Sequence, residues 1–124
     1  MEESSSSQPS FATAINCMDG RVQLPVTSFA CHQFKVDYVD MVTGAGAVAY
    51  VDEDLLRQVG ISLKAHQSRG VVVAAHQGCA GNPIDDASHQ SQCLIAAEKV
   101  RLAYPGVEVV AVWVCLNGDV DIIS

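Results

Sequence analysis

Residues able to do chemistry gather in two short clusters of this 124-residue chain, Cys17-Met18-Asp19-Gly20-Arg21 and His76-Gln77-Gly78-Cys79. Each cluster directly follows an apolar run of the kind that forms a buried β-strand. If those strands are parallel neighbours, both clusters emerge at the same edge of one sheet. Two thiols and one imidazole meeting there make a Cys2His set, which binds zinc and leaves a fourth position for water or a nearby carboxylate.

A charged pair, Asp19 and Arg21, is expected beside that open position. An ionised Asp19 accepts the remaining proton of a metal-bound hydroxide and turns an oxygen lone pair toward an electrophile. Arg21, two residues on, keeps this carboxylate charged and fixed in direction through a charge-assisted contact. If the pair opened, Asp19 could swing onto the metal, so the same carboxylate would allow an active and an inhibited state.

The elements that must position these clusters alternate between strand and helix. Strands are expected at Phe11–Asn16, Val36–Thr43, Val71–Ala75 and Val107–Leu116, and helices at Val26–Phe34, Asp52–Gln67 and Ala87–Tyr104. This alternation predicts an α/β fold, a three-layer sandwich around a mostly parallel sheet, and one common order for such a sheet is 2-1-3-4. Strand one then lies beside strand three at the switch point, where ligands gather outside the carboxyl ends of the strands. The tail from Gly118 has no pattern that predicts a structure.

Composition restricts the possible partners. Residues 1–10 are polar and Ser-rich and are expected to be a disordered tail, with residues 11–124 forming one domain. The chain has 7 basic and 14 acidic residues, a net charge of −7, which disfavours nucleic acid and anionic membranes as partners. Its longest apolar run is too short to cross a bilayer. Five cysteines, an odd number, with no secretory signal favour a reducing, cytoplasmic location.

The pattern Cys-x-Asp-x-Arg, then the small-residue stretch Gly44-Ala45-Gly46-Ala47, then His-x-x-Cys resembles the β-class carbonic anhydrases. The resemblance covers Phe11 to Leu116. It implies that the small-residue stretch lies near the substrate. It also implies the fold of that family and an assembly of two or more subunits, with the pocket at a subunit interface.

The same resemblance assigns roles to the two clusters. It implies that Cys17, His76 and Cys79 hold one Zn²⁺ per chain and that Asp19 and Arg21 form the catalytic dyad. The activity it implies is the reversible hydration of carbon dioxide to bicarbonate by metal-bound hydroxide.

Two departures from the family bear on the substrate: Gly20 stands where many members have Ser, and Ala80 separates Cys79 from the next Gly. Relatives with the same metal site hydrolyse carbon disulfide or carbonyl sulfide, which are linear and apolar like carbon dioxide. A non-catalytic zinc domain of this fold is a further alternative. A phosphatase-type nucleophile at Cys17 is disfavoured, because only three residues separate it from Arg21.

The remaining cysteines and histidines have simpler interpretations. Cys93 and Cys115 are expected in the core, and Trp113 in the core or at a subunit interface. Cys31 with His32 is not expected to form a second metal site. His66 and His89 are expected at the surface or flanking helices, with His89 as a proton shuttle if it faces the cleft.

Overall fold

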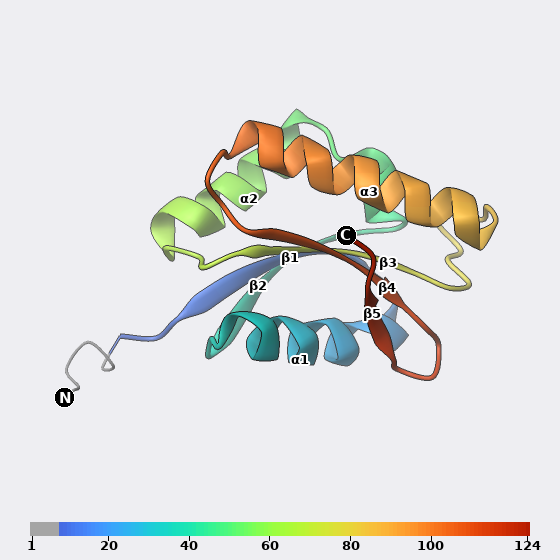
Figure 1. The fold of residues 1–124 in the computed structure, drawn as a ribbon, viewed down its shortest axis with the longest axis horizontal. Coiled ribbons are helices and arrows are strands. Elements are labelled where there is room, and N and C mark those ends of the chain that lie inside the picture. The colour runs from blue at the N-terminus through green and yellow to red at the C-terminus, as the bar shows by residue number, and fades with distance from the viewer. Residues whose placement is uncertain (1–7) are drawn as a thin grey trace.

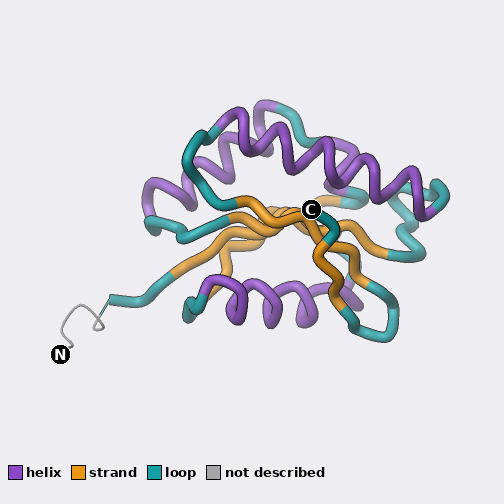
Figure 2. Tube along the Cα trace, in the orientation of Figure 1, coloured by secondary structure: helices purple, strands orange, loops and turns teal. Residues whose placement is uncertain are grey.

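The computed structural model describes residues 8–124, so most of the predicted disordered tail, residues 1–7, lies outside the described residues. Figures 1 and 2 show a central sheet with helices on both sides. The strands are β1 (Phe11–Cys17), β2 (Tyr38–Gly44), β3 (Val71–His76), β4 (Val109–Val114) and β5 (Val120–Ile122). The helices are α1 (Gln23–Phe34), α2 (Glu53–Ala65) and α3 (Asp86–Ala103), with short 3₁₀ turns η2 (Gly20–Val22) and η3 (Ala47–Tyr50).

The sheet has the strand order β2-β1-β3-β4-β5. Strands β2, β1, β3 and β4 run parallel, and β5 pairs antiparallel with β4. Every residue of β3 and β4 is buried, as expected for parallel strands covered on both faces. The predicted α/β class and the order of the first four strands are therefore confirmed.

Helix α1 covers one face of the sheet, and α2 and α3 cover the other (Figure 1). Each face has its own apolar core. Cys93 and Trp113 belong to the core beneath α2 and α3, as predicted, and burial raises the pKa of the Cys93 thiol to about 12. The side chains of Asp52 and Asp85 accept hydrogen bonds from backbone N–H groups in the first turns of α2 and α3, which fixes where both helices begin.

The structure corrects several predicted boundaries. Helix α1 begins at Gln23 rather than Val26, because Pro25 lies in the first turn, where a missing N–H costs no hydrogen bond. The last long strand ends at Val114, so Cys115 is only half-buried and lies in the turn into β5. The tail after Gly118, for which no structure was predicted, forms β5. No helix in residues 8–124 has the length and apolarity needed to span a bilayer.

Close packing at Gly70, just before β3, gives a stability prediction. A Cβ placed on this buried glycine would lie 2.2 Å from Cε1 of Phe34, so Gly70→Ala should lower the free energy of unfolding by about 1–3 kcal/mol through overpacking. Urea unfolding checks this. Gly20→Ala is the control, because a Cβ there meets nothing within 4 Å. Equal unfolding midpoints for the two variants would contradict the close packing of Gly70 against Phe34.

Candidate metal centre

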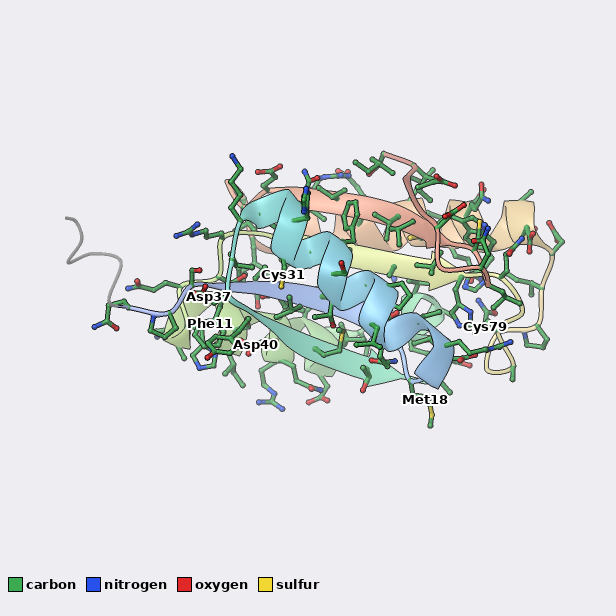
Figure 3. All side chains as sticks on the ribbon, turned by 90° about the horizontal axis from the view of Figure 1, so that it is seen from below. Phe11, Met18, Cys31, Asp37, Asp40 and Cys79 are labelled. Atoms are coloured by element: carbon green, nitrogen blue, oxygen red, sulfur yellow. The ribbon has the colours of Figure 1, made fainter. Side chains whose placement is uncertain are left out.

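The two clusters meet because they end adjacent parallel strands. Cys17 is the last residue of β1 and His76 is the last residue of β3, so both lie at the carboxyl edge of the sheet. Cys79 follows in the loop after β3. One ligand atom from each of the three residues lies within 4.8 Å of the others. In Figure 3, Cys79 and Met18, which follows Cys17, lie at one end of the molecule and Phe11 and Asp40 at the other.

His76 presents a free ring nitrogen to this cluster. Its side chain is only 1% exposed, and its Nδ1 donates a hydrogen bond to the backbone oxygen of Gln77 at 2.6 Å. That bond leaves the lone pair of Nε2 available. Nε2 is buried and has no hydrogen-bond partner in the described residues. A buried nitrogen left without a partner is costly, and coordination of a cation removes that cost.

The thiols show the same need for a cation. Cys17 and Cys79 are each 6% exposed, and their sulfur atoms lie 3.8 Å apart. Burial and then the neighbouring Cys17 raise the pKa of the Cys79 thiol. Two thiolates this close in a nearly dry place would repel each other, whereas a divalent cation between them compensates both charges. These residues fit Zn²⁺, and within residues 8–124 no other three such side chains converge in this way.

The small-residue stretch after β2 contacts this cluster directly. Gly46 donates its N–H to the sulfur of Cys17 at 3.4 Å, and it has a left-handed φ of 65°. A Cβ at this position would lie 2.8 Å from the backbone oxygen of Gly81. Only glycine allows the loops after β2 and β3 to approach this closely.

Asp19 and Arg21 form a fork-shaped ion pair next to the thiols. Arg21 Nε lies 3.0 Å from Asp19 Oδ1, and Arg21 Nη2 lies 2.6 Å from Oδ2. Asp19 also accepts the backbone N–H of Arg21 at 2.8 Å, which caps η2. The Arg21 guanidinium holds the pKa of the Asp19 carboxyl well below its usual range. Arg21 Nη2 further lies 3.3 Å from the backbone oxygen of Gly78, so this ion pair also joins the two clusters.

His89 corrects a sequence-based prediction. It was expected at the surface or flanking a helix, but it is 2% exposed on α3, and its ring centroid lies 6.4 Å from that of His76. Trp113 packs edge-on against it at 5.5 Å, and burial lowers the pKa of its imidazole. The spacing could have indicated this, because His89, Cys93, Ala97 and Val100 fall on one helical stripe.

The other histidines and cysteines discussed in the sequence analysis do not belong to the converging cluster of Cys17, His76 and Cys79. His66 is exposed and pairs with Asp40 at 2.6 Å, at the opposite end of the sheet. Cys31 is half-buried and His32 exposed on α1, away from the three converging donors. Gln23 contacts the first cluster through its side chain, and no sequence pattern pointed to it.

Comparisons with known proteins agree with this geometry. The family model described as "Putative carbonic anhydrase" matches residues 7–124. The comparison with curated protein sequences gives no match.

Solved structures share the fold at low sequence identity. A carbonic anhydrase from Streptococcus mutans superposes with a TM-score of 0.70 at 18% identity, covering 94% of this chain and 84% of that one. A tetrameric β-carbonic anhydrase from Sordaria macrospora gives 0.67 at 12% identity, covering 97% and 83%. A carbon disulfide hydrolase gives 0.61 at 14% identity, covering 91% and 78%. Identities this low show the fold alone. Because the family model spans nearly the whole chain, the protein belongs to the carbonic anhydrase family and has the β-class fold.

Proposed function

We propose that Cys17, His76 and Cys79 hold one Zn²⁺ per chain and that this centre catalyses the reversible hydration of carbon dioxide to bicarbonate. The observation that carries the proposal is the convergence of three buried soft donors, one of them the unpartnered Nε2 of His76. Membership of the carbonic anhydrase family supports the reaction type.

Each of the three donors has a defined part in holding the ion. His76 binds through Nε2, because Nδ1 is engaged by the Gln77 carbonyl, which also fixes the ring in direction. Cys17 and Cys79 bind as thiolates, and the N–H of Gly46 supports the charge on Cys17. Zinc, when bound, supplies Lewis acidity that lowers the pKa of a water molecule toward neutrality.

Asp19 orients the attacking oxygen. Its carboxylate is kept ionised by Arg21. Oδ1 already accepts two N–H groups of Arg21, whereas Oδ2 has one short bond, from Nη2, and can accept a further hydrogen bond. By accepting a hydrogen bond from the O–H group of the attacking oxygen, Asp19 turns a lone pair of that oxygen toward the carbon of carbon dioxide. The side chain of Arg21 contacts the carboxylate through two N–H groups, which keeps it charged and restrains its rotation. The Asp19 side chain is 18% exposed, which leaves it open to incoming water.

A second candidate keeps the metal and changes the substrate to carbon disulfide or carbonyl sulfide. It is favoured by the shared fold with a carbon disulfide hydrolase. These substrates are linear and apolar like carbon dioxide, and the same donors and carboxylate would serve them. Parallel assays of carbon dioxide hydration and of sulfide release separate the two candidates. A zinc domain without catalytic activity would show neither.

We also expect a homodimer or larger assembly in the cytoplasm. The Sordaria macrospora enzymes of the same fold are tetrameric. All five cysteines of this chain are free, which fits a reducing compartment.

Metal content tests the ligand set directly. Purified protein should contain about one zinc per chain, and Cys17→Ser should bring the zinc content close to zero, because two donors hold the ion far more weakly than three. Elemental analysis of protein dialysed without chelator measures the number of zinc ions per chain. Cys31→Ser is the matched control, since Cys31 lies outside the cluster, and it should keep the wild-type content. Full zinc in Cys17→Ser would refute the ligand assignment.

Removing the charge of Asp19 tests its role. Asp19→Asn keeps the shape but loses the ionised acceptor, so kcat for carbon dioxide hydration should fall on the order of a hundredfold. The zinc content should stay the same, because Asp19 is outside the proposed ligand set. Stopped-flow hydration assays and elemental analysis on the same batch measure both.

Asp54→Asn is the matched control, because Asp54 also pairs with an arginine, Arg57, at 3.0 Å on the exposed surface of α2. Its kcat should equal that of the wild type. If Asp19→Asn hydrates carbon dioxide at the wild-type rate, the centre does not work as proposed.

A further inference from the structure

Gln23, the first residue of α1, bridges two backbone carbonyls of the loop that carries the charged pair. Its Nε2 lies 2.7 Å from the backbone oxygen of Cys17 and 2.9 Å from that of Asp19. Both neighbours are carbonyl oxygens, which only accept, and the amide nitrogen has two N–H donors. Each N–H therefore goes to one carbonyl. A single half-buried side chain thus joins the end of β1 to the loop that follows it.

Gln23 and Arg21 contact different parts of Asp19: Gln23 binds its backbone oxygen, and the side chain of Arg21 binds its carboxylate. Arg21 fixes the carboxylate, but the Arg21 side chain is itself 54% exposed, so it has freedom to move with its partner. Gln23 instead fixes the main chain of Asp19, whose carbonyl also accepts the N–H of Val22 at 3.2 Å. The direction of a short side chain follows the direction of its Cα–Cβ bond. The carboxylate is therefore aimed by the backbone that Gln23 holds.

We propose that Gln23 is a positioning residue: it fixes the main chain between Cys17 and Asp19, and so aims the Asp19 carboxylate relative to the metal centre. The inference rests on the proposed function. Gln23 acts through Asp19, so its loss should slow turnover while the three metal ligands stay in place.

Two substitutions at the same position separate the donor from the shape of the side chain. Gln23→Glu has nearly the same shape but no N–H, and its oxygens would face two carbonyl oxygens. Gln23→Lys restores a donor of similar reach with three N–H groups. The matched control is Gln33→Glu, which makes the same charge change on the same helix, at a residue whose side chain has no hydrogen bond to residues 8–124.

In zinc-loaded protein, kcat of Gln23→Glu should fall on the order of tenfold to a hundredfold, the usual cost of misplacing a reacting group by about 1 Å. KM should stay within about twofold, because substrate binding is not the property that changes. Zinc content should remain that of the wild type, Gln23→Lys should recover most of the lost kcat, and Gln33→Glu should match the wild type. A loss of zinc together with kcat, or an unchanged kcat, overturns the proposal.

Hydrogen exchange provides a readout that does not depend on turnover. The backbone amides from Met18 to Val22 should exchange faster in Gln23→Glu than in wild type and Gln33→Glu, because the loop has lost its bridge. Unchanged exchange in this segment overturns the proposal. If Gln23→Glu does not fold, Gln23→Met, which is uncharged and similar in length, takes its place in every measurement.

The two proposals fail in different ways. A wild-type protein that contains zinc but acts on neither carbon dioxide nor the sulfur analogues refutes the proposed function, whatever the exchange rates. A wild-type protein that is active, with kcat and loop exchange both insensitive to Gln23→Glu, refutes the role of Gln23 alone.

Discussion

The parallel pairing of β1 with β3 is the constraint on which the centre depends. Parallel neighbours end at the same edge of a sheet, so the last residues of these strands face the same space although half the chain lies between them. Burial on both faces keeps that pairing rigid, because β3 is covered by α1 below and by α3 above. The cysteine of the first cluster and the histidine of the second are thus held by strands and not by mobile loops. Two of the three converging donors are therefore held at a fixed separation by strands, and Cys79 follows in the loop after β3.

Features that depend on residues close together in the sequence could be predicted from it, whereas features that depend on contacts between distant segments could not. The apolar runs and the alternation of strand with helix predicted the elements and the fold class, because hydrophobic periodicity is a local signal. The order of the first four strands came instead from a common topology of such sheets. The meeting of the two clusters followed from topology. The sequence does not predict the short strand β5, since three residues of which none is fully buried carry almost no hydrophobic periodicity. Its position depends on pairing with β4, which the local sequence does not reveal.

The details around the centre were harder to predict for the same reason. A histidine taken singly is most simply a surface residue, and only the helical register of His89 with Cys93 and Val100 indicates the buried stripe of α3. The bridge from Gln23 had no sequence signal, since a glutamine at the start of a helix is ordinarily solvated. Its partners are main-chain oxygens, which every residue has, so residue types could not indicate them. The fork between Asp19 and Arg21 was expected, because a spacing of two residues already limits how the side chains can meet.

The contact of Gly46 with Gly81 has a consequence for the chemistry of the cysteine sulfur. The N–H that reaches the sulfur of Cys17 belongs to a main chain that packs closely against the backbone of Gly81, so this N–H is held in place by the path of the chain. An N–H aimed at a thiolate draws electron density from the sulfur and makes it a weaker electron donor to any ion it holds. If Cys17 holds the metal ion as proposed, its electron-donating strength depends on how the backbone at Gly46 is placed.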